Sequence, residues 1–389
     1  MEKIIPYKEN KGNVRTISPE TDKSCFFGYY DLKAYDDTDK YHLCNIADFE
    51  DRLPVSTDKL QLGVVDLETR KFEKIDETSS WNFQQGALLQ WSRAEKDVVY
   101  YNVFENGEYF TVKKNVKTGN KTYAPVCANI SRDGKFGLKI IFQRIYDFRP
   151  GYGYCNTKDP FFDVAQPEND GVFLVDIEKG TEKQILSYPD MVKLLGIPEF
   201  EFTKFVVNHI TFNPKGDKFM LLLRNFYEQG KPWRTALIVS DLDGNMKLLY
   251  FGGCSHYDWI NNDELFIYLL GQDFWDLFTV NVVTGELERI KNHQLENVDT
   301  HCLFSKDKSV FIGDCYPDND GYRTIYRYSY NTDKYDVLVK SYSPSPTVPA
   351  GSDVRTDLHN RWNTKGDKIS FDTIHHGKRE IAELEYGNY

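Results

Sequence analysis

The sequence lacks the features of membrane-inserted, secreted and nucleic-acid-binding proteins. No run approaches the roughly 18 apolar residues of a transmembrane helix, and the N-terminal MEKIIPYKEN has no apolar stretch, which predicts no secretory signal. A formal net charge of −11 argues against nucleic acid or an anionic membrane as a partner. The seven cysteines are scattered and form no CxxC pair, which favours reduced thiols and a cytoplasmic location.

Apolar residues at helical spacing are nearly absent, and short runs rich in β-branched and aromatic residues take their place. Seven such runs each follow a polar turn, several of which contain an Asp-Gly or Lys-Gly step. Glycine accepts the positive φ that tight turns require, so these steps predict hairpins. The turns with their runs are YDDTDKYHLCNI (35–46), WSRAEKDVVYYNV (91–103), ISRDGKFGLKII (130–141), FNPKGDKFMLLL (212–223), INNDELFIYLL (260–270), FSKDKSVFIGD (304–314) and WNTKGDKISFDT (362–373).

A second hairpin follows each of the first six runs, in segments with a turn similar to D/N-x-x-T/K-G. These segments span 64–75, 113–123, 174–185, 238–249, 279–290 and 328–339. Each repeat therefore holds about four short strands, at the spacing typical of all-β folds. Four strands in each of seven repeats predict an all-β fold, a seven-bladed β-propeller in one domain over residues 1–389.

The two ends of the chain complement each other. The seventh repeat ends at IAELEYGNY (381–389), one strand short, and NVRTIS (13–18) has no blade of its own. An open ring would leave unpaired strand edges. We therefore expect the N-terminal segment to join the last blade and close the ring.

The repeats are unequal in length. The longest gap holds an excursion over 142–171 that is rich in aromatic residues, glycine and arginine. Long loops in compact domains are usually functional or disordered, and the aromatic content here favours function. One short helix is expected over 187–197.

One short pattern, a histidine three residues before a large aromatic residue, occurs four times in consecutive repeats. The four segments are NHITF (208–212), SHYDW (255–259), THCLF (300–304) and LHNRW (358–362). Half of the eight histidines of the chain thus share one position of the repeat. Because the first strand of each propeller blade is the innermost, these four imidazoles should form an arc around the central channel.

Two interpretations of this arc remain open. Converging imidazoles can bind a divalent metal or transfer protons, because each has a lone pair and a pKa near neutrality. A histidine can also be structural, bonding one strand to a neighbouring turn in each blade. A structural residue would be expected in all seven blades, whereas this one occurs in four, which favours function.

Other polar residues are expected at the same end of the channel. We interpret the following four as substrate-binding candidates: Tyr30, Gln85, Asn208 and Arg361. The excursion adds Arg144, a fifth substrate-binding candidate, and Arg149, Tyr152 and Tyr154, which are candidate catalytic residues. Together they predict a channel mouth that holds cations, phenols and imidazoles.

Imidazole, phenol and guanidinium suit β-elimination in a uronic-acid glycan. The C5 proton becomes acidic only when the neighbouring carboxylate is neutralised by arginine or a divalent cation. A neutral histidine can then remove this proton, while a tyrosine or a second histidine protonates the leaving oxygen. Glycoside hydrolysis requires two carboxylates instead, and Asp31 is the one acid in the histidine column.

The segments NHITFNPKG, SHYDWINNDE, THCLFSKDKSVFIGD and DLHNRWNTKGDKISFDTIHHGKRE resemble the oligogalacturonate lyase family, in layout over nearly the whole chain. This resemblance implies a seven-bladed propeller that cleaves uronate oligomers with a histidine base, an arginine and a divalent metal. His209 then resembles the base, and His256 and His301 resemble metal ligands. The family also supplies a glutamine ligand, which is missing beside His301, and we add His359 as the further ligand.

The expected cofactor is a divalent metal, manganese or calcium, and the expected partner is an acidic oligosaccharide. The proton donor remains open among Tyr152, Tyr154 and a histidine. The alternative function is a non-catalytic propeller that binds a glycan or a protein. A hydrolase or isomerase on the same scaffold is a third possibility, because fold does not fix function.

Overall fold

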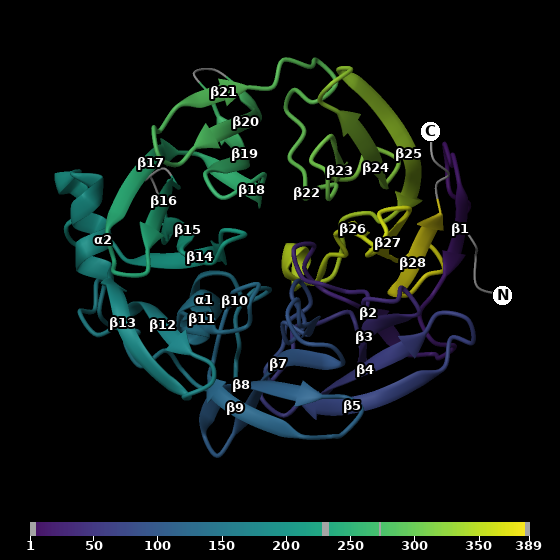
Figure 1. Ribbon diagram of the computed structural model, residues 1–389, viewed down its shortest axis with the longest axis horizontal. Helices are drawn as coiled ribbons and strands as arrows, with labels where there is room; N and C mark the ends of the chain where they lie inside the picture. Colours follow the sequence, from purple (N-terminus) through teal and green to yellow (C-terminus); the bar gives the residue numbers. More distant parts are fainter. Residues whose placement is uncertain (1–4, 228–232, 272–273, 386–389) are drawn as a thin grey trace.

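Seven four-stranded antiparallel sheets surround a central axis in the computed structural model, which describes residues 5–227, 233–271 and 274–385 (Figure 1). The predicted seven-bladed β-propeller is confirmed. The first four blades, from the axis outward, are β2 (Ser24–Phe26), β3 (Tyr41–Ala47), β4 (Leu60–Asp66) and β5 (Phe72–Thr78); β6 (Gln90–Trp91), β7 (Val98–Glu105), β8 (Glu108–Asn115) and β9 (Lys121–Pro125); β10 (Asn129–Ile130), β11 (Phe136–Lys139), β12 (Gly171–Asp176) and β13 (Thr181–Ser187); β14 (Phe205–Phe212), β15 (Lys218–Asn225), β16 (Thr235–Asp241) and β17 (Met246–Gly252).

The remaining three blades complete the ring. They are β18 (Cys254–Trp259), β19 (Glu264–Leu270), β20 (Trp275–Asn281) and β21 (Leu287–Arg289); β22 (Cys302–Phe304), β23 (Val310–Asp314), β24 (Tyr322–Ser329) and β25 (Lys334–Tyr342); β26 (Arg361–Trp362), β27 (Lys368–Thr373), β28 (Glu380–Glu385) and β1 (Asn13–Thr16). The N-terminal strand β1 pairs antiparallel with β28, so the predicted closure of the ring is also confirmed.

The polar turns of the repeats form the hairpins that the sequence predicts. In FNPKGDK, the side chain of Asn213 accepts hydrogen bonds from the backbone N–H groups of residues 216, 217 and 218, at 2.8, 3.1 and 3.2 Å. Asn363 in WNTKGDK makes the same three bonds, and both glycines have a positive φ, +79° at Gly216 and +80° at Gly366. The repeated letters therefore encode one repeated turn.

The core lies between neighbouring blades. All eight residues of β14 are buried. On the neighbouring strand β15, Met220 and Leu222 pack with Leu265 and Ile267 of β19 in the following blade. Burial of apolar area on this scale is the main favourable term in folding. The inner strands are thereby held in fixed positions around the axis.

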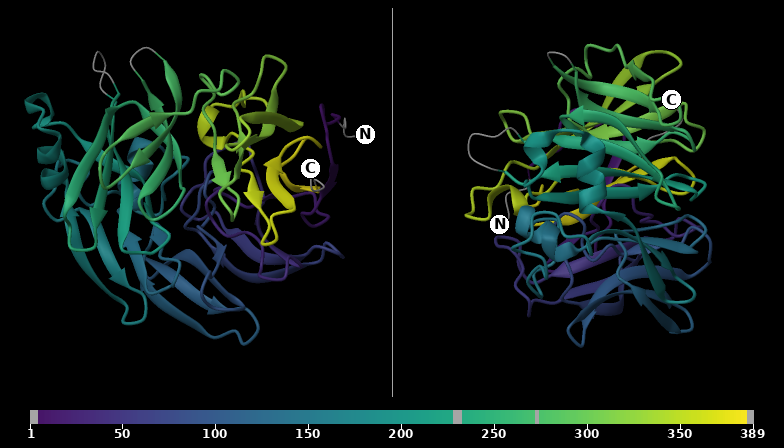
Figure 2. Two further views of the ribbon diagram at one scale, coloured as in Figure 1. Left: turned by 45° about the horizontal axis from the view of Figure 1, so that its top comes forward. Right: turned by 90° about the vertical axis from the view of Figure 1, so that its left-hand side faces the viewer.

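Within the described ranges, two α-helices and two short 3₁₀-helices interrupt the strands. The 3₁₀-helices span Pro198–Phe200 and Gly351–Val354. Helix α2 (Tyr188–Leu195) falls within the range predicted for a helix and packs outside the ring, against β13 and β17 (Figure 2). The excursion begins with α1 (Phe142–Phe148), which the sequence pattern does not predict, because this seven-residue helix depends on tertiary packing of Phe142 and Ile145.

No helix among the described residues combines the length and apolar character that a membrane span requires.

Candidate functional site

The four histidines of the repeat column lie together at one end of the channel. The ring centroids of His256 and His301 are 4.0 Å apart, and those of His301 and His359 are 4.4 Å apart. His209 joins them through Tyr29, whose ring lies 5.4 Å from that of His209 and 5.0 Å from that of His359. Each histidine is at most 6% exposed. Residues separated by up to 150 positions thus form one imidazole cluster.

Asp314, at the end of β23, orients two of these histidines. Its Oδ1 atom accepts hydrogen bonds from the backbone N–H of His301 at 2.9 Å and from the ring Nδ1 at 2.8 Å. Its Oδ2 atom accepts the backbone N–H of His359 at 2.9 Å. An ionised carboxylate only accepts hydrogen bonds, so the proton of His301 lies on Nδ1 and the lone pair on Nε2.

His301, His359 and Asp357 form a group that could hold a divalent metal. Each offers a ligand atom, and these atoms lie within 4.8 Å of one another. The Nε2 atoms of both histidines are buried without a hydrogen-bond partner among the described residues. A buried polar atom without a partner is costly, and a metal ion would remove that cost. His359 also has a φ of +45°, which is uncommon outside glycine and typical of functional positions.

The donor set suits some metals better than others. Two imidazole nitrogens and one carboxylate oxygen are ligands for manganese, iron or zinc, whereas calcium prefers oxygen ligands alone. Asp357 is also ion-paired with Arg323 at 2.9 Å and Arg355 at 2.7 Å, so a metal would share this carboxylate with two guanidinium groups. The residues therefore fit manganese better than calcium, the other metal that the sequence suggested.

His256, a predicted ligand, lies outside this group. Its Nδ1 atom is 2.5 Å from Oδ1 of Asp299, so the ring donates to this carboxylate and presents the Nε2 lone pair. Sequence reasoning missed Asp299, Asp314 and Asp357. A usable signal was present, because Asp299 and Asp357 each stand two residues before a histidine of the column, in DTH and DLH.

Burial controls the protonation of the cluster. It places the pKa of His209 and that of His359 well below the usual value of 6.5, and nearby cationic and imidazole groups lower them further. Burial also lowers the pKa of His256, but the charge of Asp299 opposes this shift. These three imidazoles are therefore neutral at pH 7, and their nitrogen lone pairs can accept a proton or bind a metal.

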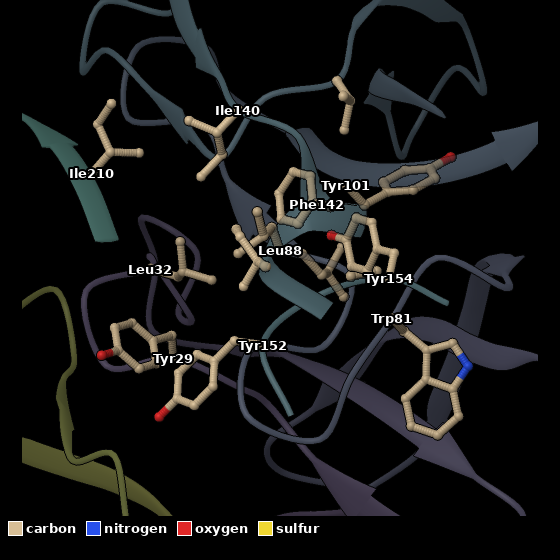
Figure 3. Close-up of a cluster of buried hydrophobic side chains, with 14 of the residues drawn as sticks. Tyr29, Leu32, Trp81, Leu88, Tyr101, Ile140, Phe142, Tyr152, Tyr154 and Ile210 are labelled. Atoms are coloured by element: carbon tan, nitrogen blue, oxygen red, sulfur yellow. The ribbon is translucent and has the colours of Figure 1, made fainter. Parts of the chain in front are cut away.

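Two tyrosines line the cluster, and one of them was not predicted. Tyr29 lies among the histidines, with its hydroxyl oxygen 3.5 Å from Nε2 of His209. Tyr152 lies beside it (Figure 3), and its hydroxyl accepts a hydrogen bond from Arg355 at 3.1 Å. Burial raises the pKa of Tyr29 well above 10, so this phenol stays protonated and can donate a proton. Sequence reasoning chose its neighbour, Tyr30.

Three cationic side chains lie close to the cluster. The guanidinium of Arg149 stacks 4.4 Å from the ring centre of Tyr152 and forms no hydrogen bond or ion pair within the described part of the chain. Arg224, on β15, donates to the side chain of Asn208 and to the carbonyl of Cys254 at 3.2 Å. Arg355 is held by Asp357. Arg149 is thus the guanidinium most available to a ligand carboxylate.

Two other predicted residues border a small cavity next to His209. Gln85 and Asn208 line this cavity of about 20 Å³ together with Tyr29 and His209. The amide nitrogen of Asn208 is buried and has no hydrogen-bond partner among the described residues. A volume of this size matches a single water molecule. Both residues are therefore close to the cluster, though on its enclosed side.

Internal contacts engage three of the predicted substrate-binding residues, Tyr30, Arg144 and Arg361, and the predicted catalytic residue Tyr154. The Tyr30 hydroxyl donates to the carbonyl of Tyr257 at 2.7 Å. Arg144 donates to the carbonyls of Phe205 and Ala165 and pairs with Asp159. Tyr154 stacks on Phe142, away from Tyr29 (Figure 3), and its hydroxyl accepts from Asn102.

Arg361 joins the last blade to the first. It donates to the carbonyl of Gly28 at 3.1 Å and to Asp372 at 3.0 Å, and Asp372 in turn accepts the backbone N–H of Phe27 at 3.1 Å. The sequence gives the type of a residue but not the partners of its side chain. It therefore does not distinguish a buried structural arginine from an arginine that binds a ligand.

We expect Arg361→Ala to lower the free energy of unfolding by about 3–5 kcal/mol, because it leaves the buried Asp372 carboxylate without its counter-charge. Equilibrium denaturation in guanidinium chloride measures this change. The matched control is Arg132→Ala, since Arg132 forms no hydrogen bond or ion pair with any other described residue. Equal stability of the two variants would contradict the structural role of Arg361.

The comparisons with known proteins agree with the fold. Neither protein-family models nor curated protein sequences match this chain. Among solved structures, an oligogalacturonate lyase from Vibrio parahaemolyticus is similar, with a TM-score of 0.69 and 15% identity over 99% of this chain and 96% of that one. An oligogalacturonate lyase in complex with manganese gives a TM-score of 0.71 and 14% identity over the same shares. This chain therefore shares the seven-bladed propeller fold of those two lyases.

Proposed function

We propose that this protein is a lyase that cleaves uronic-acid oligosaccharides by β-elimination. The observation that carries the proposal is the convergence of three chemical elements in one cluster. These are a neutral imidazole oriented by a carboxylate, a guanidinium without an internal partner and a nitrogen–oxygen group that fits a divalent metal. The similarity in fold to two oligogalacturonate lyases supports the proposal.

The substrate carboxylate must first be neutralised. We assign this role to Arg149, which is half-buried above the Tyr152 ring and free to form a bidentate pair with a carboxylate. A metal at His301, Asp357 and His359 would supply further positive charge for the electron density that develops on the carboxylate. Arg224 adds long-range positive charge.

His256 is the better candidate for the base, in place of His209. Asp299 holds the His256 proton on Nδ1, so Nε2 can accept the C5 proton. The same carboxylate keeps the ring more basic than burial alone would allow, whereas Arg224 makes His209 less basic. His209 instead lies beside the Tyr29 hydroxyl, the candidate proton donor.

The reaction then balances with these groups. His256 takes the proton from C5, the electrons of that bond form the C4–C5 double bond, and the bond from C4 to the glycosidic oxygen breaks. The leaving oxygen takes the hydroxyl proton of Tyr29. Hydrolysis is less well supported, because Asp299, Asp314 and Asp357 are all engaged by histidine or arginine.

Two aromatic side chains could bind the sugar rings. Trp233 is 48% exposed and lies with its ring 4.8 Å from the guanidinium of Arg224. Tyr316 is 43% exposed and lies 5.4 Å from that of Arg323. Exposed aromatic faces beside cations suit an acidic sugar. The same two residues would also serve the alternative function, a propeller that binds a glycan without cleaving it.

The test is an elimination assay on a panel of uronate oligomers that differ in sugar and linkage, with manganese added. We expect the ultraviolet absorbance of the unsaturated product to rise with at least one uronate oligomer and with no neutral oligosaccharide. Binding of a uronate oligomer without product would support the non-catalytic alternative. Release of a saturated sugar would indicate hydrolysis and contradict the proposal.

A further inference from the structure

A second cavity opens at the opposite end of the channel from the histidines. It has a volume of about 580 Å³ and lies among the polar turns that follow the inner strands. All seven blades contribute to its lining, whereas none of the four clustered histidines belongs to it. The proposed lyase chemistry does not use this cavity.

Tyr29 and Tyr30 separate the two ends of the channel. The Tyr29 ring contacts the histidine cluster, and Tyr30 lines the second cavity while its ring also lies 5.2 Å from that of His301. Their ring centres are 4.7 Å apart, and the Tyr30 hydroxyl is anchored on the backbone of Tyr257 in the fifth blade. Both tyrosines are at most 2% exposed. These packed rings lie between the histidine cluster and the second cavity, whose lining contains none of the four histidines.

The charge of the second cavity contrasts with that of the whole chain. Its lining has six cationic side chains and two acidic ones, in a protein with a net charge of −11. Asp372 neutralises Arg361, and Asp37 neutralises Lys33. Four cations have no acidic partner in an ion pair among the residues that the structure describes, and they come from the second, third and sixth blades: Arg93, Arg132, Lys306 and Lys308.

Two of these four have a structural contact and two do not. Arg93 donates to the carbonyl of Asp31 at 3.0 Å, and Lys308 donates to that of Trp259 at 3.1 Å. Arg132 and Lys306 form no hydrogen bond or ion pair with any described residue, although both line the cavity. Bonding between blades therefore explains half of the set, and the other two cations, which line the cavity at exposed positions, have no such contact among the described residues.

The cations also repel one another. Enclosure by protein together with the charge of Arg132 lowers the pKa of Arg93 to about 10. Arg93 is nevertheless exposed to solvent, since its side chain lines the open cavity. Enclosure lowers the pKa of Lys308, and Arg132 and Arg93 lower it further. A bound anion would relieve this repulsion.

The two acids of the lining do not cancel this charge. Asp258 accepts the backbone N–H of Phe304 at 3.0 Å, which ties it to the next blade. Burial raises the pKa of Asp31 to about 6, so this carboxyl is mostly ionised at pH 7, and two acids against the four cations still leave the lining positively charged. A channel with low-dielectric walls concentrates the field of the remaining cations.

We propose that this cavity binds a small polyanion that carries phosphate or carboxylate groups. Arg132 and Lys306 are its principal contacts, because they are free of internal partners, and Arg93 and Lys308 supply additional charge. The volume exceeds that of a single phosphate ion and fits a compound the size of a diphosphate or an acidic disaccharide. The inference does not depend on the lyase function.

The experiment titrates the full-length, metal-free protein by calorimetry at physiological ionic strength with two probes, inorganic pyrophosphate and digalacturonate. We expect one pyrophosphate to bind per chain. Digalacturonate should also bind at the histidine cluster if the proposed lyase function holds, so its affinity for this cavity is taken from the part of its binding that the Arg132/Lys306 double variant removes, and the tighter probe identifies phosphate or carboxylate as the preferred group. The double variant Arg132→Gln/Lys306→Gln should weaken binding by about tenfold or more, because the two strongest charge contacts are lost. The matched control, Lys183→Gln/Lys193→Gln, removes the same charge from elsewhere on the surface and should leave the affinity unchanged.

A His301→Ala variant distinguishes this site from the histidine cluster, and we expect it to bind pyrophosphate as the unmodified protein does. The proposal is overturned if neither probe binds at millimolar concentration. It is also overturned if the Arg132/Lys306 double variant binds normally, or if His301→Ala abolishes binding. Thermal unfolding of each variant confirms that it is folded before titration.

Discussion

His256→Ala is expected to lower kcat for β-elimination by about 10²–10⁴-fold, the usual contribution of a general base. The variant removes the one imidazole of the cluster whose Nδ1 is held by a carboxylate while it lies outside the candidate metal group. KM should change less than kcat, because the base acts on the C5 proton in the transition state. Steady-state kinetics with the best substrate of the panel, at saturating manganese, measures both.

His209→Ala is the comparison that tests the choice of base. His209 lies beside Tyr29 and not beside a carboxylate, so we expect a smaller loss in kcat than for His256→Ala. If His209→Ala abolishes activity and His256→Ala retains most of it, the assignment from the sequence is right and the present one is wrong.

Asp299 is a positioning residue for His256, and the pH profile of Asp299→Asn tests this. The negative charge of Asp299 favours protonated His256, so its removal lowers the pKa of the imidazole further. The base is active when neutral, and activity is lost as the pH falls through this pKa. The acid limb of kcat/KM should therefore move to lower pH, while kcat decreases because the ring is less well oriented.

A matched control for this variant is Asp243→Asn, at an exposed turn between β16 and β17. It removes the same charge far from the cluster and should leave the profile unchanged. An acid limb at the same pH in Asp299→Asn and in the unmodified protein would show that His256 does not titrate as the base.

The fold was predictable because each repeat carries its own signal. Polar turns such as FNPKGDK and WNTKGDK mark a hairpin in each of the seven repeats. The segment NVRTIS, which has no blade of its own in the sequence, supplies the strand that is missing from the last blade. The histidine column was predictable for the same reason, since equivalent positions in a closed ring must lie near one another. Structural features that recur in every repeat, or at one position of several repeats, can therefore be predicted from the sequence.

The rest of the site depends on contacts that do not repeat. Asp314 and Asp372 occupy similar places near the end of the second strand of their blades, yet one orients two histidines and the other binds Arg361. Tyr29 and Tyr30 are adjacent and both contact the histidines, but the hydroxyl of Tyr29 lies beside His209, whereas that of Tyr30 donates to the carbonyl of Tyr257. The direction and the partners of a side chain are properties of the three-dimensional structure. Residue type and spacing therefore did not distinguish the role of Asp314 from that of Asp372, or the role of Tyr29 from that of Tyr30.

The second prediction with a large expected effect concerns metal binding by His301, Asp357 and His359. We expect manganese to bind the purified protein with a stoichiometry near one, and His301→Ala or His359→Ala to weaken this binding by about 100-fold or more, since each removes one of three protein ligands. Equilibrium dialysis or the electron paramagnetic resonance signal of free Mn²⁺ measures the affinity without any need for activity. Calcium should bind far more weakly than manganese, because two of the three donors are nitrogen.

Asp314→Asn tests whether the orientation of the ligands matters as much as their presence. The variant keeps the size of the side chain but loses the charge that holds Nδ1–H of His301, so manganese affinity should fall by about 10–100-fold. The control, Asp318→Asn, changes a carboxylate in the loop that follows β23 and lies outside the metal group. Manganese that binds equally well to the His301→Ala and Asp314→Asn variants and to the unmodified protein would place the ion elsewhere. In that case Arg149 and Arg224 would have to neutralise the substrate carboxylate without a metal in the histidine cluster.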